Sequence, residues 1–416
     1  MTRKSATSLI QPSALAARVA IAIAGFCACL DLYPTQPMLP LFERLFGVSK
    51  AGASLTVSAT TLVVALVAPL SGALADRLGR KRVIVAATLL LSIPTALAAT
   101  ATTLPALIVW RLAQGLFIPG VLSVAIAHIS DEWAEGGVGA AMAALVTGNV
   151  IGGFSGRLVA GAVTHAWGWR YSFLALGAIN LAGALVTWRY LPPDRHFTPH
   201  APAATRRISP SVVIDRIKSV MSGRLLVSYA VGFNVLFSLV ATFTYVTFRL
   251  AEPPFSLDQF ELSAMFAVYL VGAVVLPFAG RFIDRVGPRT VLAVALSTAI
   301  TGALLTLSGR LTVVVIGLSM CAASAFVCQS SSTSYLRVVA PRGARGVASG
   351  VYISIYYIGG SVGAVLPAVA WRAGGWPACV ALVVAVQLVT LVLASTLERK
   401  GRAAPLDEVS EVATVA

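Results

Sequence analysis

Twelve long apolar runs alternate with short polar connectors along the chain. A helix of roughly 20 apolar residues crosses a hydrocarbon core about 30 Å thick and satisfies its own backbone hydrogen bonds. The predicted spans lie at 16–42, 52–75, 83–102, 104–129, 140–164, 171–191, 224–249, 261–283, 290–308, 311–336, 347–371 and 377–397. The pattern therefore predicts an all-α membrane protein with 12 transmembrane helices.

A polar stretch rich in Pro, His and Arg separates the first six spans from the last six. It predicts an amino-terminal bundle at 1–191, a linker at 192–223, a carboxy-terminal bundle at 224–397 and a tail at 398–416. Lys and Arg are concentrated in the linker, the two ends and every second connector. The positive-inside rule then predicts that both termini and the linker face the cytoplasm.

Composition excludes several other classes. Hydrophobic residues make up 57% of the chain and charged residues only 11%, whereas soluble proteins carry about a quarter. The net charge of +15 lies in connectors rather than on a folded basic face, so no nucleic acid partner is expected. The five Cys and four His lack metal-ligand or disulfide spacing, and no phosphate loop or nucleophile elbow is present. We therefore expect no enzyme, no metal and no cofactor.

The two halves repeat. The segment GALADRLGRKR at Gly72–Arg82 returns as GRFIDRVGPR at Gly280–Arg289, and nearly the same offset aligns Gly152 with Gly359. Two independent matches at one spacing indicate a duplication. Because each half has an even number of spans, the copies are expected to be parallel repeats about an axis along the membrane normal.

The first of these segments resembles the signature loop between helices 2 and 3 of the major facilitator superfamily. The resemblance extends over nearly the whole chain and implies two six-helix bundles related by a pseudo-two-fold axis. It also implies a cytoplasmic gating loop, here Gly72, Asp76, Arg77, Gly79, Arg80, Asp284, Arg285 and Gly287. From the residues themselves, Gly72 would allow a close helix approach, Gly79 a tight reversal, and Asp76 a contact with a helix amino terminus or an Arg. The alternative is an ordinary positive connector containing a turn.

The fourth span contains RLAQGLFIPG, which resembles the second signature of the superfamily's proton-coupled exporters. An Arg in hydrocarbon costs about 2.5 kcal/mol or more, so Arg111 should face a cavity or a partner. Asp31 is the only acid deep within an apolar span and is the predicted partner and proton carrier. In the alternative, Arg111 extends to the membrane interface and Asp31 caps a kink before Pro34 and Pro37.

The fifth span reads GNVIGGFSGRLVAG, with small residues at four-residue spacing that predict a helix-packing face. Its continuation to HAWGWRYSF resembles the YnfM group, the acriflavine-sensitivity branch of the superfamily. Proton-coupled exporters usually have a Gly-Pro pair here, whereas this chain has Gly156 followed by Arg157.

The second half has no counterpart of Asp31 or Arg111 and offers uncharged polar and aromatic groups instead. We therefore predict that the first half handles the proton and the second half shapes the substrate surface. The predicted substrate cavity comprises Gln36, Gln114, Asn149, Arg157, Asn234, Tyr245, Gln329, Tyr352 and Tyr356. Some of these groups could instead hydrogen-bond between helices.

The resemblance implies a secondary active transporter that exports a small molecule in exchange for protons by alternating access. It is expected as a monomer among the lipids of a bacterial inner membrane. One alternative is an importer or facilitator of a small polar metabolite or sugar. Another is a transport-inactive membrane receptor or scaffold that recruits a partner through its linker.

Overall fold

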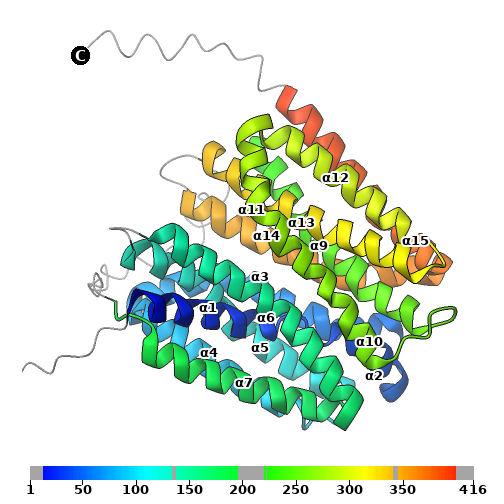
Figure 1. The fold of residues 1–416 in the computed structure, drawn as a ribbon, viewed down its shortest axis with the longest axis horizontal. Helices are drawn as coiled ribbons and strands as arrows, with labels where there is room; N and C mark the ends of the chain where they lie inside the picture. Colours follow the sequence, from blue (N-terminus) through cyan, green and yellow to red (C-terminus); the bar gives the residue numbers. More distant parts are fainter. Residues whose placement is uncertain (1–12, 134–136, 195–219, 222, 341–344, 400–416) are drawn as a thin grey trace, which may run out of the picture. The chain divides into compact units, whose positions relative to one another are not determined.

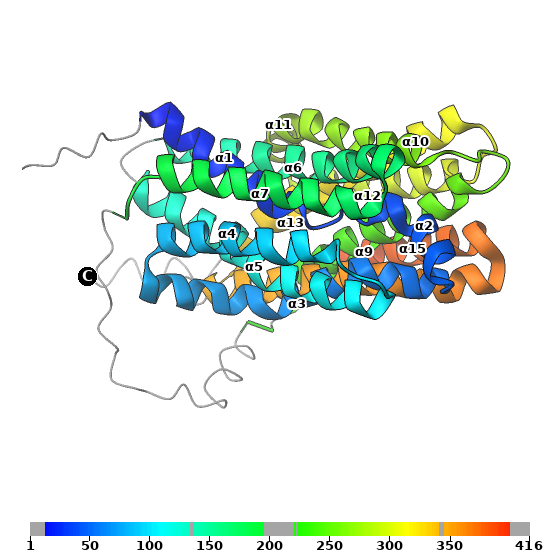
Figure 2. The same cartoon turned by 90° about the horizontal axis from the view of Figure 1, so that it is seen from below.

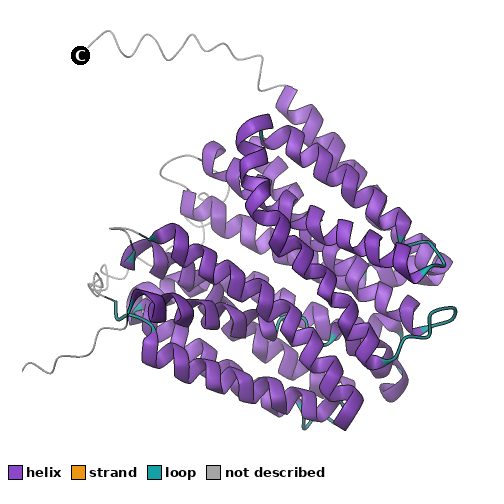
Figure 3. Cartoon of the chain, viewed as in Figure 1, coloured by secondary structure: helices purple, strands orange, loops and turns teal. Residues whose placement is uncertain are grey.

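Every regular element of the described chain is a helix. The computed structural model describes residues 13–133, 137–194, 220–221, 223–340 and 345–399, and Figure 3 shows helices joined by short loops throughout this part. The first half contains α1 (Ala14–Leu30), η1 (Gln36–Met38), α2 (Leu39–Phe46), α3 (Lys50–Leu78), α4 (Arg80–Ala98), α5 (Leu104–Glu132), α6 (Val138–Trp167) and α7 (Trp169–Tyr190). The second contains α9 (Gly223–Ala251), α10 (Gln259–Ala264), η2 (Met265–Val268), α11 (Tyr269–Val286), α12 (Pro288–Leu305), α13 (Leu311–Val339), α14 (Arg345–Val365) and α15 (Pro367–Arg399). The prediction of an all-α fold is confirmed.

The helices have the length and surface of membrane spans. Within the described residues, nine helices are long and apolar enough to cross a bilayer, and three shorter apolar helices cover Ala14–Leu30, Gln259–Gly272 and Thr290–Leu305. Together they account for the twelve predicted spans. Large apolar side chains such as Leu66, Leu70 and Trp188 lie on the outside at more than 60% exposure, which suits contact with lipid tails rather than water.

Three predicted spans are interrupted in the structure. The first, predicted as one helix over 16–42, breaks after Leu30 and resumes as η1 and α2, while the eighth is divided into α10, η2 and α11. The eleventh was predicted to reach residue 371, but α14 ends at Val365. The following helix is kinked at Gly374 and Gly375, and the φ of Gly375 is 63°, a left-handed conformation that favours glycine.

Contacts divide the chain into two compact units. The first comprises Met1–Thr205 together with Leu257–Leu270, and the second comprises Arg206–Ser256 together with Val271–Ala416. Within the first unit, Figure 1 shows α1, α6 and α7 packed together, and Figure 2 shows α3, α4 and α5 side by side. The predicted division at a 192–223 linker stays a prediction, because most of that linker lies outside the described residues.

Glycine contacts confirm the predicted packing face of the fifth span. Cβ atoms built on Gly152 and Gly156 of α6 would lie 2.2 and 2.1 Å from the carbonyl oxygens of Phe26 and Leu30 in α1. Only glycine permits this backbone approach. In the second unit, Gly359 and Gly363 of α14 meet the carbonyl oxygens of Phe233 and Phe237 in α9 at 2.2 and 2.5 Å.

These four contacts share one offset between the halves. Gly152 and Gly359 are 207 positions apart, as are their partners Phe26 and Phe233. The left-handed glycines Gly168 and Gly375 are separated by the same offset. The offset therefore identifies structurally equivalent positions in the two units.

Candidate functional site

The break in the first membrane span creates a polar centre inside the first unit. Helix α1 ends at Leu30, and Pro34 and Pro37 follow. Proline cannot continue an α-helix, so the carbonyls of Asp31 and Leu32, which lie just past the end of α1, lack helical partners, and lipid offers no water to replace them. The guanidinium of Arg111 on α5 takes their place: its Nη1 donates to the Asp31 carbonyl at 2.7 Å and its Nη2 to the Leu32 carbonyl at 2.9 Å.

Arg111 also contacts α3 and a residue of its own helix. Its Nε donates to the Thr56 carbonyl on α3 at 2.8 Å, and its Nη1 donates to Oε1 of Gln114. The residue is fully buried, so the alternative in which it extends to the membrane interface is wrong. A cation at a helix carboxy terminus is also favoured by the helix dipole. Arg111 thus closes the broken end of α1.

The Asp31 carboxylate is held by neutral groups on neighbouring helices. It is completely buried, and its Oδ2 accepts hydrogen bonds from Thr95 Oγ1 on α4 at 2.7 Å and from Asn180 Nδ2 on α7. Gln114 Nε2 donates to the same Thr95 hydroxyl at 2.9 Å, which links the carboxylate to Arg111. Oδ1 of Asp31 has no hydrogen-bond partner among the described residues.

The predicted pairing of Asp31 with Arg111 therefore needs correction. The two residues do meet, but the guanidinium binds main-chain oxygens and Gln114, and the carboxylate binds Thr95 and Asn180. The physical reason is the helix break, which offers the guanidinium carbonyl acceptors. Sequence reasoning missed Thr95 and Asn180, because single polar residues in apolar spans commonly hydrogen-bond within their own helix.

A second buried guanidinium contacts the same interrupted segment of the first span. Arg157 on α6 is 2% exposed; its Nε donates to Gln36 Oε1 at 2.7 Å and its Nη1 to the Gly153 carbonyl at 2.6 Å. Three rings surround its Cζ, which lies 4.9, 5.0 and 4.5 Å from the ring centres of Tyr33, Phe266 and Tyr269. We call these three rings the aromatic cage. All belong to the first unit.

The remaining predicted cavity residues have varied surroundings. With its amide oriented to satisfy both bonds, Asn149 donates to the Gly25 and Leu145 carbonyls at 3.2 and 3.3 Å, a contact between α6 and α1. Tyr245 is fully buried and donates to the Ala364 carbonyl at 3.0 Å. Tyr352 stacks on Tyr356 with ring centres 6.2 Å apart. The other predicted member, Gln329, is half-buried on α13. Their role in substrate binding stays a prediction.

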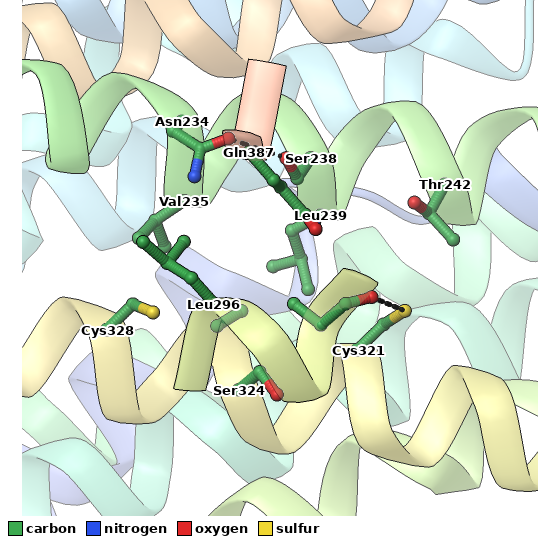
Figure 4. A pocket seen from close by; sticks show the side chains of 12 residues that line it. Asn234, Val235, Ser238, Leu239, Thr242, Leu296, Cys321, Ser324, Cys328 and Gln387 are labelled. Carbon is green, nitrogen blue, oxygen red and sulfur yellow. Dashed lines mark hydrogen bonds between the residues drawn. The ribbon is translucent and has the colours of Figure 1, made fainter. Parts of the chain in front are cut away.

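The second unit holds a small cavity at the position equivalent to the Asp31 centre, and several polar side chains are among the residues that line it. It offers about 20 Å³ to the centres of water-sized molecules, room for one or two waters. Figure 4 shows Asn234 and Ser238 of α9, Ser324 of α13 and Gln387 of α15 lining it. Ser238 donates to Asn234 Oδ1 at 2.8 Å, whereas Ser324 Oγ and Gln387 Oε1 have no partner among the described residues.

The 207-residue offset relates this cavity to the Asp31 centre residue by residue. Asp31 corresponds to Ser238 and Asn180 to Gln387. Arg111 corresponds to Leu318, which is fully buried. The duplicated position is thus charged in the first unit and neutral in the second. Gln387 was not among the predicted site residues, because its equivalent Asn180 was itself missed.

The predicted gating loop forms the same turn in both copies. Gly79 and Gly287 have φ values of 93° and 82°, so the expected tight reversal is confirmed. Asp76 lies 3.9 Å from Arg80 one turn later, and Arg80 also pairs with Asp131. Gly72 was expected to permit a close helix approach, but a Cβ there would meet nothing within 4 Å.

The rest of the loop is less informative. Arg77 and Arg285 are exposed, and the side chain of Asp284 lies outside those described. Asp76 was expected to contact a helix amino terminus or an Arg, and its contact with Arg80 confirms the second alternative. Another acid occupies the helix amino terminus. The carboxylate of Asp194, which follows α7, accepts from the Lys81 backbone N–H at 3.1 and 3.2 Å, in the first turn of α4.

Asp194 also contacts His128 on α5, with 3.1 Å between Oδ1 and Nδ1. Burial raises the pKa of Asp194, but its bonds to His128 and Lys81 and the charges of His128 and Arg80 outweigh burial and hold it below the ordinary value. Nothing in the sequence pairs Asp194 with residues more than 60 positions away, so this contact was missed. Asp194 thereby links the first turn of α4 to α5 and to the chain that follows α7.

Comparisons with known proteins give a consistent picture. The sequence profile described as the Major Facilitator Superfamily matches residues 21–364 and 243–412. The uncharacterised MFS-type transporter YybF of Bacillus subtilis is 31% identical over 90% of this chain and 92% of its own. The inner membrane transport protein YnfM of Escherichia coli is 31% identical over 94% of this chain and 92% of its own.

Among solved structures, the nucleoside transporter NupG (D323A mutant) superposes with a TM-score of 0.74 at 16% identity. The match covers 91% of this chain and 99% of that one. At this identity the likeness concerns the fold, and it confirms the predicted twelve-helix architecture.

Proposed function

The chain belongs to the major facilitator superfamily, and from this premise we propose that it is a proton-coupled transporter that exports a small molecule, with Asp31 as the proton carrier. A multi-pass membrane transporter is established by the family. The coupling rests on one observation: Asp31 is the only buried carboxylate in the described chain, and it lies within the network that holds the broken end of α1.

The network offers two arrangements that differ by one proton. Ionised Asp31 leaves Oδ1 without a donor among the described residues, which is costly at a fully buried position. A proton on Oδ1 removes the buried charge. The single hydroxyl proton of Thr95 is then no longer needed at Oδ2 and can be donated fully to the Leu91 carbonyl, which lies 2.8 Å from Oγ1. Protonation would thereby loosen the link from α1 to α4.

Proton binding would then act on the position of the helix break. Asp31 contributes both the titrating carboxylate and one of the carbonyls that Arg111 holds. A change in one is readily transmitted to the other, because only three covalent bonds separate the carboxyl carbon from the carbonyl carbon of the same residue. A family member that alternates between inward and outward access needs such a charge-dependent change in helix packing.

Export is favoured by the sequence of α5. The run from Arg111 through Gln114 and Gly115 to Pro119 and Gly120 resembles the second signature of the superfamily's exporters. We propose that the protein works in the inner membrane of a bacterium, with both termini in the cytoplasm, as the distribution of Lys and Arg indicates.

Proteoliposomes that contain the pH dye pyranine test the proposal. A chemically diverse set of compounds is screened for proton flux that depends on the protein, and the strongest responder is then used as substrate. Asp31→Asn, which resembles the protonated acid, should abolish transport driven by a pH gradient while retaining substrate exchange at equal pH.

Glu43→Gln provides the matched control, because Glu43 is a carboxylate of the same unit that pairs with Lys50 at 3.0 Å and is partly exposed. It should retain both activities. Undiminished pH-driven transport in the Asp31→Asn protein would refute the assignment, as would the absence of proton flux with every compound.

A further inference from the structure

Arg157 is a buried cation that no buried acid of the described residues balances. Within the described chain, Asp31 is the only buried carboxylate, whereas Arg111 and Arg157 are both buried guanidinium groups. Asp31 belongs to the network of Arg111, and the buried His128 contacts Asp194. Arg157 forms no ion pair with any described residue. The interior therefore carries one excess positive charge at membrane depth, where a charge without a partner is costly.

The guanidinium keeps donors available for a further acceptor. Its two hydrogen bonds go from Nε to Gln36 and from Nη1 to Gly153. Nη2 carries two more N–H groups, and these have no partner among the described residues. Nη1 also carries a second N–H besides the one that donates to Gly153, and one N–H from each of the two nitrogens forms the planar fork that matches a carboxylate. The cage rings stabilise the cation by their faces but cannot neutralise it.

We infer that Arg157 binds the carboxylate of an organic anion, and that this anion is the class of molecule the protein carries. The substrate supplies the negative charge that the interior lacks and accepts the Nη2 donors. The rings of Tyr33, Phe266 and Tyr269 favour an anion with an apolar body over a small hydrated ion, because apolar surfaces line the charge on three sides.

The cage also covers the site. Arg157 is only 2% exposed, so an anion reaches Nη2 only when rings withdraw. Phe266 and Tyr269 come from η2 and the start of α11, in the Leu257–Leu270 segment. That segment is separated along the chain from the rest of the first unit. We therefore place the movable side of the cage on this segment.

The transport part of this inference rests on the proposed function, whereas the binding part stands alone. Binding is measured on the purified full-length protein by the shift of its unfolding temperature. The probes are benzoate, 1-naphthoate and octanoate, each compared with its neutral amide, and benzylamine as a cation of similar size.

At least one carboxylate should stabilise the wild-type protein, and its amide should bind roughly tenfold or more weakly, the size expected for a charge-assisted bidentate contact. Arg157→Gln should remove the preference for the carboxylate. Arg157→Lys keeps the charge without the planar fork and should bind with intermediate strength. The wild-type comparison of acid with amide decides the question even if Arg157→Gln does not fold.

Arg170→Gln is the matched control. Arg170 also stacks on a ring, with 4.6 Å between its Cζ and the centre of Trp169, and donates to the Ala101 carbonyl, but it is exposed. Its replacement should leave binding unchanged. The inference is overturned if no carboxylate binds, if amide or benzylamine binds as well as the acid, or if Arg157→Gln keeps the preference.

The variants separate the two proposals. Asp31→Asn should keep the preference for the carboxylate over its amide while losing pH-driven transport, because Arg157 and the aromatic cage are intact. Arg157→Gln should lose carboxylate binding. If the transported molecule proves to be a cation exchanged for protons, the role of Asp31 stands and only the role of Arg157 is refuted.

Discussion

Replacing Arg111 by lysine distinguishes a charge partner from a helix cap. If the main role of Arg111 were to neutralise Asp31, lysine would preserve it, because the positive charge remains. The structure instead shows a guanidinium fork that donates to the carbonyls of Asp31, Leu32 and Thr56. A lysine ammonium on a flexible stem cannot reach three acceptors on two helices in this arrangement.

The magnitude follows from these bonds. Hydrogen bonds inside membrane proteins contribute about 0.6 kcal/mol each on average, whereas those to charged groups in buried sites contribute about 1.5–3 kcal/mol. Loss of three carbonyl contacts therefore corresponds to roughly 2 kcal/mol at the lower figure and more at the higher one. We expect Arg111→Lys to lower the free energy of unfolding by about 2–5 kcal/mol.

Unfolding in mixed micelles with increasing SDS, followed by tryptophan fluorescence, measures this loss. Arg111→Gln should be destabilised by a similar or larger amount, and Asp31→Asn by much less, because the carbonyl of residue 31 remains. An Arg111→Lys protein as stable as the wild type, together with a strongly destabilised Asp31→Asn protein, would show that an ion pair holds the break and would refute the capping argument.

Two other perturbations have outcomes that the structure determines. Gly152→Ala places a Cβ 2.2 Å from the Phe26 carbonyl oxygen and should clearly lower thermal stability; Gly139→Ala, on the same helix with nothing within 4 Å, should be neutral or stabilise by up to about 1 kcal/mol. Asp194 has a lowered pKa, so its contribution to stability is present above its ordinary value near 3.8 and is lost as the pH falls through the lower, folded-state value. The stability difference between wild type and Asp194→Asn should therefore shrink between pH 6 and pH 3; a difference that grows on acidification would contradict this.

The sequence predicted the helices well and their interruptions poorly. Apolar runs identify spans because a helix in the lipid core needs apolar side chains. Gly79 and Gly287 identify turns because the positive φ of these turns favours glycine. Pro34 and Pro37 were visible as a kink, but the length of chain lost from the helix depended on Arg111 being available to hold the freed carbonyls. That depends on tertiary packing.

The residues of the candidate site likewise divide into those that the sequence predicted and those that it did not. Asp31 and Arg111 were predicted because charge at membrane depth is rare and expensive. Thr95, Asn180 and Asp194 were not predicted, because the groups with which they form hydrogen bonds are main-chain groups or residues distant in sequence. A main-chain carbonyl has no signature in the sequence, so the true partners of Arg111 could only come from the structure.

The two proposed sites share the interrupted segment of the first span, and this gives the coupling a physical route. Arg111 holds the carbonyls of Asp31 and Leu32, and Arg157 contacts the side chains of Tyr33 and Gln36. Four of six consecutive residues thus contact one guanidinium or the other.

A proton on Asp31 changes the bonds at the start of the segment, and an anion on Arg157 would compete with the contacts at its end. Because the segment is not helical between them, its backbone can adjust without unwinding a full span. The equivalent positions in the second unit hold Ser238 and a buried Leu318, so the charges that we propose link the two events are present at this place in the first unit and absent from its equivalent in the second.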